Sequence, residues 1–203
     1  MRTAEPLTLD IPAILAKHDP SGRIREYHTA LMRENAVVNL VSRETTETDF
    51  LRLCAESLLP FETEALAQRT FASYLDIGSG GGLPAIPLLL TGKASGKSVL
   101  YERTQKKAAA LQRILGALKL SAHVLPLSFG ETPRSDRFSL VTVRYVTLTD
   151  KMLRDIVKLL TPDGHCIYYA RPDFKTKVGQ ATIYPYLVPP DTVARHFSII
   201  KVK

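Results

Sequence analysis

The segment from Tyr74 to Pro84 reads YLDIGSGGGLP and constrains the fold of this chain more than any other stretch. An apolar run ends in Asp76, and a glycine-rich turn and then a proline follow it. Glycine adopts positive φ angles without steric cost and lets a ligand approach the backbone closely. Proline is favoured in the first turn of a helix. The segment therefore predicts a strand, a tight loop and a helix that together hold a small ligand against bare backbone.

The spacing of the glycines discriminates between classes of ligand. Dinucleotide-binding loops read GxGxxG, with a ribose-binding acid about 20 residues further on. Here Gly78, Gly80 and Gly82 alternate, and Asp76 precedes the first of them by two positions. We expect this form for S-adenosylmethionine (AdoMet), whose methionine ammonium needs a nearby carboxylate and which has no pyrophosphate. Glu102 ends the next apolar run, where an acid can bind both ribose hydroxyls; the alternative is a flexible turn and a solvated strand end.

The composition is that of one ordinary domain. The chain has 203 residues, of which 45% are hydrophobic, which is enough for a single core. Its longest apolar stretch, Leu83 to Leu90, is too short to cross a bilayer, and Glu5 and Asp10 interrupt any secretory segment. Cys54 and Cys166 are far apart and read as buried thiols, and no metal-ligand spacing is present. We therefore expect a cytoplasmic protein with no metal and no membrane segment.

The formal net charge is +7. A basic excess favours polyanionic partners, because neutralising phosphates releases counterions. A merely well-solvated surface would have the same composition, so the charge alone leaves both interpretations open.

Residues 1–68 are predicted to form a helical cap. Asp10 and Ser21 are expected to cap the first two helices, and a third is expected to run from Glu47 and to end at Pro60. Strand signals are few here, so this part should cover a sheet rather than join it.

Residues 69–203 alternate between strands and helices and are predicted to be one compact AdoMet-binding methyltransferase domain. Alternation of this kind implies a mostly parallel sheet with right-handed crossovers. The last two strands follow each other without a helix and predict a hairpin. The fold class is thus α/β: a Rossmann-like class I AdoMet-dependent methyltransferase with a seven-stranded sheet that ends in an antiparallel hairpin. The expected strands are 71–77, 98–102, 122–127, 138–143, 166–170, 183–188 and 196–202, and the expected helices 84–91, 104–119 and 151–160.

Several separate motifs, in order along the chain, resemble one family, the RsmG (GidB) guanine-N7 methyltransferases of 16S ribosomal RNA. The most specific is the glycine loop with a second proline three residues after the first. Together the motifs span about residues 24 to 202. They are Val38–Ser42, Glu56-Ser57-Leu58, Asp76–Leu88, Glu102–Lys107, Arg144 within Val143–Val146, and Ala194–Ile200.

The sequence also departs from the family pattern, mostly on the side expected to face RNA. Leu53 replaces a histidine, and Ser128-Phe129-Gly130-Glu131 replaces an alanine–glutamate pair near the adenine. The fifth strand should end in lysine–glycine but reads Tyr169-Ala170-Arg171-Pro172, and only Pro172–Gln180 is available for the helix that usually follows.

The resemblance implies methylation of a guanine N7 in small-subunit ribosomal RNA. N7 carries a free lone pair, so no general base is required, and catalysis rests on holding N7 near the methyl group. Arg144 ends the fourth strand, where doubly wound sheets place substrate groups, and is the residue assigned to catalysis. The expected cofactor-binding residues are Asp76, Gly78, Ser79, Gly80, Gly82, Leu83, Glu102 and Arg103, and the expected substrate-binding residues are Arg144, Arg171 and Arg195.

The expected partner is ribosomal RNA or the small ribosomal subunit, and a monomer is favoured. Two other hypotheses stay open. The chain could be an AdoMet methyltransferase for a small molecule, or a non-catalytic paralogue that binds AdoMet or RNA. A steep salt dependence of RNA binding separates the RNA enzyme from the small-molecule enzyme.

Overall fold

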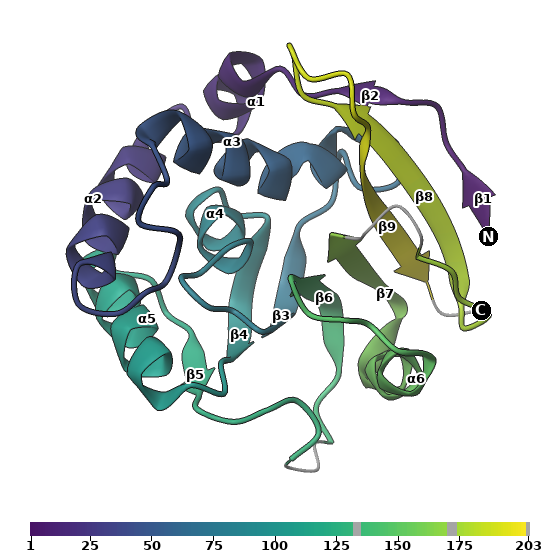
Figure 1. Cartoon of the computed structure of the whole chain (residues 1–203). Coiled ribbons are helices and arrows are strands. Elements are labelled where there is room, and N and C mark those ends of the chain that lie inside the picture. The colour runs from purple at the N-terminus through teal and green to yellow at the C-terminus, as the bar shows by residue number, and fades with distance from the viewer. Residues whose placement is uncertain (132–134, 170–173, 202–203) are drawn as a thin grey trace.

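The computed structural model describes residues 1–131, 135–169 and 174–201. Its centre is one mixed sheet in the order β1-β8-β9-β7-β6-β3-β4-β5, with β2 also paired to β8 (Figure 1). Neighbours from β7 to β5 are parallel, whereas β9 runs antiparallel to β7 and β8. The strands are β1 (Arg2–Thr3), β2 (Leu7–Thr8), β3 (Phe71–Ile77), β4 (Ala94–Tyr101), β5 (His123–Leu125), β6 (Phe138–Arg144), β7 (Leu160–Tyr169), β8 (Gln180–Leu187) and β9 (Arg195–Lys201).

The expected Rossmann-like α/β sheet with its C-terminal hairpin is confirmed, but in the described residues it has nine strands rather than seven. The two additional strands come from the extreme N-terminus, which was expected only to cover the sheet. Arg2 and Thr3 pair with Thr182 and Ile183 of β8, and β2 pairs further along the same strand. The physical reason is that β8 would otherwise be an edge strand, whose free backbone groups pair even with two-residue segments.

The helices lie on both faces of the sheet. Figure 1 shows α1, α2, α3 and α5 in an arc along one side, with α6 apart from them. One apolar core joins the α1–α5 side to residues such as Tyr74 and Ile167, and a second joins α6 to Leu75 and Val141. Neighbouring residues of a strand thus face opposite cores, as the alternation of side chains requires. The helices are α1 (Ile11–His18), α2 (Arg23–Asn35), α3 (Glu47–Leu58), the 3-10 helix η1 (Leu59–Glu62), α4 (Ala85–Leu90), α5 (Gln105–Ala117) and α6 (Asp150–Leu159).

The helix starts follow ordinary capping chemistry, with one correction. Asp10 caps α1 as expected, and its carboxylate accepts the Ala13 amide at 3.0 Å. Ser21 does not cap α2: Gly22 holds the cap position at φ 71°, and the Asp19 carboxylate accepts the Arg23 and Ile24 amides. A carboxylate that reaches over a left-handed glycine satisfies the free amides of the first turn as well as an adjacent serine would.

Three strands begin at least three residues earlier than the sequence suggests, among them β8, which begins at Gln180 rather than at residue 183. β4 begins at Ala94 rather than at residue 98, and β7 begins at Leu160, immediately after α6, where a separate turn was expected. A register shift against β6 between Phe138 and Leu140 absorbs the turn-like residues 161–164 within the strand. The end of the predicted fifth strand, residue 170, lies outside the described residues.

The sheet order itself indicates where a site should lie. The chain leaves β3 toward β4 and β5, then returns to β6 on the other side of β3. β3 and β6 are therefore neighbours whose connections run in opposite directions, and the crevice outside their carboxyl ends is the usual place for a ligand in such sheets.

Candidate functional site

A cavity of about 1030 Å³ opens at this point. It is at the upper end of the ordinary size for a ligand pocket, about 300–1,000 Å³. Its wall combines the glycine loop, the ends of β4, β5 and β6, and the segment that leads from α2 into α3. The residues that line it include Ser79, Gly80, Glu102, Arg103, Lys107, Phe129, Arg144 and Tyr145, and the N-terminal contribution runs from Leu40 to Leu53.

The glycine loop after β3 is fixed by its own backbone. The amides of Gly78 and Ser79 both donate to the carbonyl of Tyr101 at 2.9 Å. Gly78 has φ 80°, and a Cβ there would lie 2.4 Å from Val146, so only glycine fits. Gly80 has φ 53°, and a Cβ on it would meet no side chain within ordinary contact distance. Gly80 therefore leaves its side of the loop open to the cavity, as expected where a ligand approaches bare backbone.

Glu102 connects this loop to the next strand end. One carboxylate oxygen accepts the Gly80 amide at 3.0 Å, and the other accepts the Thr104 amide at 2.8 Å. The side chain is buried, yet it contributes to the cavity wall. Each oxygen has a second lone pair, so Glu102 can accept two hydroxyl donors from a ligand without losing the bonds that orient it.

Asp76 lies one layer deeper and is not among the cavity-lining residues. Its carboxylate is 1% exposed. One oxygen accepts the Thr142 hydroxyl, which in turn accepts the hydroxyl of Tyr74 at 2.7 Å. The other oxygen forms no hydrogen bond of ordinary geometry with the described residues. Burial raises the pKa of Asp76 to about 6, against the opposing effect of the Ser79 and Thr142 hydroxyls.

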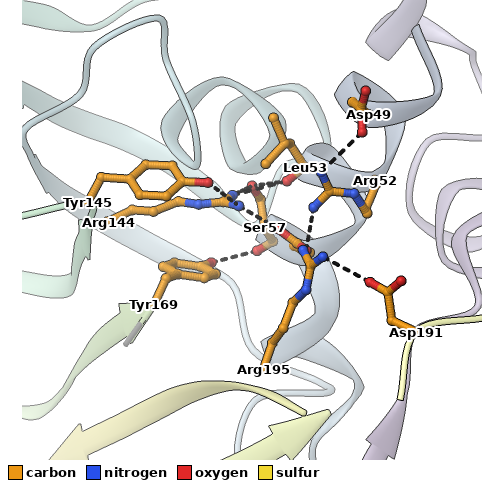
Figure 2. Close-up of polar contacts among 10 residues, drawn as sticks. Asp49, Arg52, Leu53, Ser57, Arg144, Tyr145, Tyr169, Asp191 and Arg195 are labelled. Carbon is orange, nitrogen blue, oxygen red and sulfur yellow. Dashed lines mark hydrogen bonds and ion pairs between the residues drawn. The ribbon is translucent and has the colours of Figure 1, made fainter. Parts of the chain in front are cut away.

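Arg144 enters a buried network with α3 (Figure 2). Its guanidinium donates to Glu56 at 2.6 Å, to the Ser57 hydroxyl at 3.1 Å and to the carbonyl of Leu53 at 3.1 Å. The side chain is buried, and it also lines the cavity. Two of the residues that hold it, Glu56 and Ser57, belong to the acid–serine–leucine motif found in the sequence.

Glu56 is shared by three arginines. Besides Arg144, it accepts Arg195 at 2.6 Å and Arg52 at 3.0 Å. Asp49 pairs with Arg52 and Asp191 with Arg195, so three positive side chains face three negative ones. The network is therefore nearly neutral, and an anionic substrate would have to compete with the carboxylates for the guanidinium groups.

The predicted site residues divide into three groups. Gly78, Ser79, Gly80, Leu83, Glu102, Arg103 and Arg144 all line the cavity. Asp76, Gly82 and Arg195 are not among the residues that line it. Arg171 lies outside the described residues.

Sequence reasoning missed three parts of the wall. Phe129, after β5, packs edge-on against Tyr101 with ring centroids 5.8 Å apart. Tyr145, after β6, is exposed and also lines the cavity, as does the loop from Leu40 to Thr45. The first two could have been found by noting that parallel strands end at one edge. The loop is marked only by the family motif Val38–Ser42, since nothing local shows which face of the sheet it covers.

Within the described residues there is no group of three or more histidine, cysteine, aspartate or glutamate side chains that could bind a metal ion. None of the helices described is both long and apolar enough to span a membrane.

Comparison with known proteins decides the family. The sequence model of GidB, described as rRNA small subunit methyltransferase G, matches residues 21–179. The chain belongs to the GidB family. It is 25% identical to the Ribosomal RNA small subunit methyltransferase G of Cereibacter sphaeroides, with 94% of this chain and 93% of that protein covered. It is 33% identical to the protein of the same name from Acidiphilium cryptum, over 71% of this chain and 65% of that protein.

Solved structures confirm the fold of this GidB family member. An O-methyltransferase from Bacillus cereus, solved with SAH, superposes with a TM-score of 0.61 at 15% identity. The match covers 95% of this chain and 100% of that one. The RsmC methyltransferase of T. thermophilus, solved with AdoMet and guanosine, gives a TM-score of 0.55 at 17% identity, over 82% of this chain and 45% of that one. The resemblance read from the sequence motifs and the Rossmann-like methyltransferase fold are thus both confirmed.

Proposed function

We propose that this GidB family member transfers a methyl group from AdoMet to guanine N7 in small-subunit ribosomal RNA. The observation that carries the proposal is the arrangement of Gly80 and Glu102. A carboxylate and a glycine with an unobstructed side are fixed to each other by a hydrogen bond, at the switch point of a methyltransferase sheet.

The residues present fit the cofactor. Glu102 would bind the two ribose hydroxyls, since both of its oxygens are oriented by backbone amides and keep free lone pairs. Phe129 and Tyr101 form an aromatic wall suited to an adenine ring. Asp76 supplies a buried negative charge behind the loop, and one of its oxygens has no hydrogen-bond partner among the described residues. A ligand with an ammonium and a sulfonium group is the partner that such a charge favours.

The loop amides support a ligand without a pyrophosphate. Those of Gly78 and Ser79 are taken by Tyr101, that of Gly80 by Glu102, and that of Gly82 by the Ser79 carbonyl. A phosphate-binding loop needs such amides free to donate to oxygens. Most of the donors here are already committed, so the site recognises its ligand through carboxylates instead.

When bound, AdoMet supplies an electrophilic methyl group on a sulfonium. The protein needs to remove no proton, because the N7 lone pair is free to form the new bond. This agrees with a cavity wall that contains no histidine and no cysteine among the described residues. Placement of N7 opposite the methyl group is then the main contribution of the chain, and such placement can supply about 7–11 kcal/mol of the barrier.

The positive charge for RNA comes from the rim rather than from the arginines that pair with Glu56. Arg103 and Lys107 line the cavity and form no ion pair within the described part of the chain. Arg144 and Arg195 instead share Glu56. We propose that Arg103 and Lys107 contact phosphates and that Arg144 positions the strand end beside the substrate.

The test is methyl transfer from radiolabelled AdoMet to small ribosomal subunits, and to their isolated RNA, from cells that lack this protein. The methylated guanine is then located by chemical cleavage at 7-methylguanosine. Methyl transfer to a single guanine N7 supports the proposal, and its absence from both substrates refutes it.

The neutral Glu56 network gives a specific reason to consider methylation of a small molecule instead. The salt dependence of kcat/KM distinguishes the two functions. Several phosphate contacts predict a steep fall of log kcat/KM with log salt concentration. Arg103→Gln and Lys107→Gln should each make that slope shallower by about one unit. A flat slope for the wild-type protein would favour the small-molecule enzyme.

A further inference from the structure

Among the described residues that line the cavity, Tyr145 is the only aromatic one that is largely exposed to solvent. It follows Arg144 directly, at the carboxyl end of β6, and is 82% exposed. The cavity's other described aromatic side chains, Tyr101 and Phe129, pack against each other. An exposed tyrosine ring gains little from packing, so its place in the wall has no explanation in the stability of the core.

The backbone conformation of Tyr145 is also unusual for a tyrosine. Its φ is 56°, in the left-handed region that bulky residues rarely occupy. Only one other non-glycine residue among those described, Lys119 just after α5, has a positive φ. The left-handed conformation destabilises a residue with a Cβ, and such strain persists where function requires it. Asparagine or glycine would adopt this conformation more easily than tyrosine does.

The ring is also held in place. The Arg144 guanidinium carbon lies 5.1 Å from the centroid of the Tyr145 ring, and an Arg144 nitrogen is 3.5 Å from its hydroxyl. In Figure 2, Tyr145 and Tyr169 lie on either side of the Arg144 side chain. Arg144 is itself anchored by Glu56 and Ser57. An exposed ring is thereby oriented before any ligand arrives, which lowers the entropy lost when one binds.

We propose that Tyr145 is the platform on which the target purine stacks, and that its ring favours the reaction as well as binding. The inference rests on the proposed function of the same cavity. A base must leave its stack before an enzyme can reach its atoms, and an aromatic ring replaces the lost stacking whatever the flanking sequence.

The reaction makes this contact stronger as it proceeds. The N7 lone pair forms the C–N bond while the methyl–sulfur bond breaks and its electron pair remains on sulfur. No proton moves, and the positive charge passes from sulfur to the purine. A cation over the face of a tyrosine ring is attracted by the negative face of that ring. The Tyr145 ring therefore binds the methylated, cationic purine more tightly than the neutral guanine, and part of this preference is present in the transition state.

The test compares Tyr145→Phe, Tyr145→Ala and Tyr145→Asn with the wild-type protein in single-turnover methylation of small ribosomal subunits. Ala and Asn should lower the rate at saturating subunit, and kcat/KM should fall about 5- to 150-fold, which corresponds to about 1–3 kcal/mol at 1.4 kcal/mol per tenfold. Phe keeps the ring and should stay within about threefold of wild type. AdoMet affinity, measured by calorimetry, should be the same in all four proteins. Tyr184→Ala, which removes a ring that stacks on Phe197 outside the cavity, is the matched control.

Two further measurements separate a functional role from a structural one. Tyr145→Asn relieves the strained φ, so its urea midpoint should equal or exceed that of wild type even though methylation falls. Quenching of the fluorescence of 7-methylguanosine monophosphate, in the presence of S-adenosylhomocysteine, should be strong with wild type and Phe and absent with Ala. The nucleotide assay needs no turnover, so it tests the stacking even if the wild-type protein methylates no RNA. Wild-type rates for Tyr145→Ala in an active enzyme, or equal quenching by wild type and Ala, would overturn the inference.

Discussion

Replacing Asp76 by asparagine should stabilise the free protein and weaken its binding of AdoMet. The carboxylate is buried, one of its oxygens lacks a hydrogen bond among the described residues, and burial raises its pKa to about 6. An ionised group in such a place opposes folding. A buried carboxylate at this position is therefore explained by a gain in affinity when a cationic ligand binds.

The size of the effect follows from the shift in pKa. Burial raises the pKa of Asp76 from the usual 3.8 to about 6. At 1.36 kcal/mol per pKa unit, the ionised carboxylate lowers the free energy of unfolding by about 3 kcal/mol. Asparagine keeps an acceptor for the Thr142 hydroxyl but buries an amide donor in place of the oxygen that has no hydrogen-bond partner among the described residues, which costs about 1–2 kcal/mol. The net gain should be about 1–2 kcal/mol at pH 8, or roughly 2–8 °C in Tm for a chain of this size.

The pH dependence has a definite sign. The folded-state pKa of Asp76 is raised, so the folded protein binds the proton more tightly than the unfolded chain does. The penalty for burying Asp76 is absent below about pH 4 and grows as the pH rises through about 6. The advantage of Asp76→Asn should therefore be present at pH 8 and lost at pH 4. AdoMet affinity of the wild-type protein should increase as the pH rises through about 6.

Urea unfolding at pH 4 and pH 8 measures the change in stability, and calorimetry measures the change in AdoMet affinity. Asp155→Asn is the control, because Asp155 lies on the exposed face of α6 in a surface ion pair with Lys158. We expect Asp76→Asn to weaken AdoMet binding by at least about tenfold, the effect of losing one charged hydrogen bond of about 1.5–3 kcal/mol. The reasoning fails if Asp76→Asn is less stable than wild type at pH 8 with an unchanged m-value, or if it binds AdoMet equally well.

Three other substitutions test the rest of the site and the fold. Glu102→Ala should weaken AdoMet binding at least about tenfold in calorimetry, because it removes the two oxygens proposed to bind the ribose, and it should change the circular dichroism spectrum little; unchanged affinity would contradict the proposed role of Glu102 in cofactor binding. Glu56→Gln should lower the free energy of unfolding by about 3–5 kcal/mol in urea titrations, because it leaves the buried Arg144 without its carboxylate; an effect below about 1 kcal/mol would contradict the network. Burial lowers the pKa of His165 to about 4, so folding favours its neutral form. The free energy of unfolding of the wild-type protein should therefore fall by at most about 3 kcal/mol as the pH drops from 6.5 toward 4. His165→Phe should flatten this pH dependence in urea titrations, and an identical slope in both proteins would assign the pH dependence to other groups.

The sequence predicted the sheet because the pattern there is local. Asp76 and the alternating glycines, followed by Glu102 at the next strand end, specify a strand, a turn and a helix through backbone geometry that only glycine tolerates. Gly78 shows this directly: its positive φ and its contact with Val146 exclude every other residue. The alternation of strands and helices then leaves few possible topologies. The part of the cavity proposed to hold the cofactor, from Ser79 to Glu102, follows from the same logic.

The tertiary structure decided the roles of the arginines and of the aromatic residues. Arg144 and Arg195 are read from the sequence as substrate contacts, yet both share Glu56, a partner distant in the sequence from each. No local pattern states which charge meets which across a fold. Tyr145 stands out only once its exposure and its φ are known. Short-range backbone rules thus fix where the candidate site lies, whereas long-range packing fixes which side chains remain free to contact a ligand there.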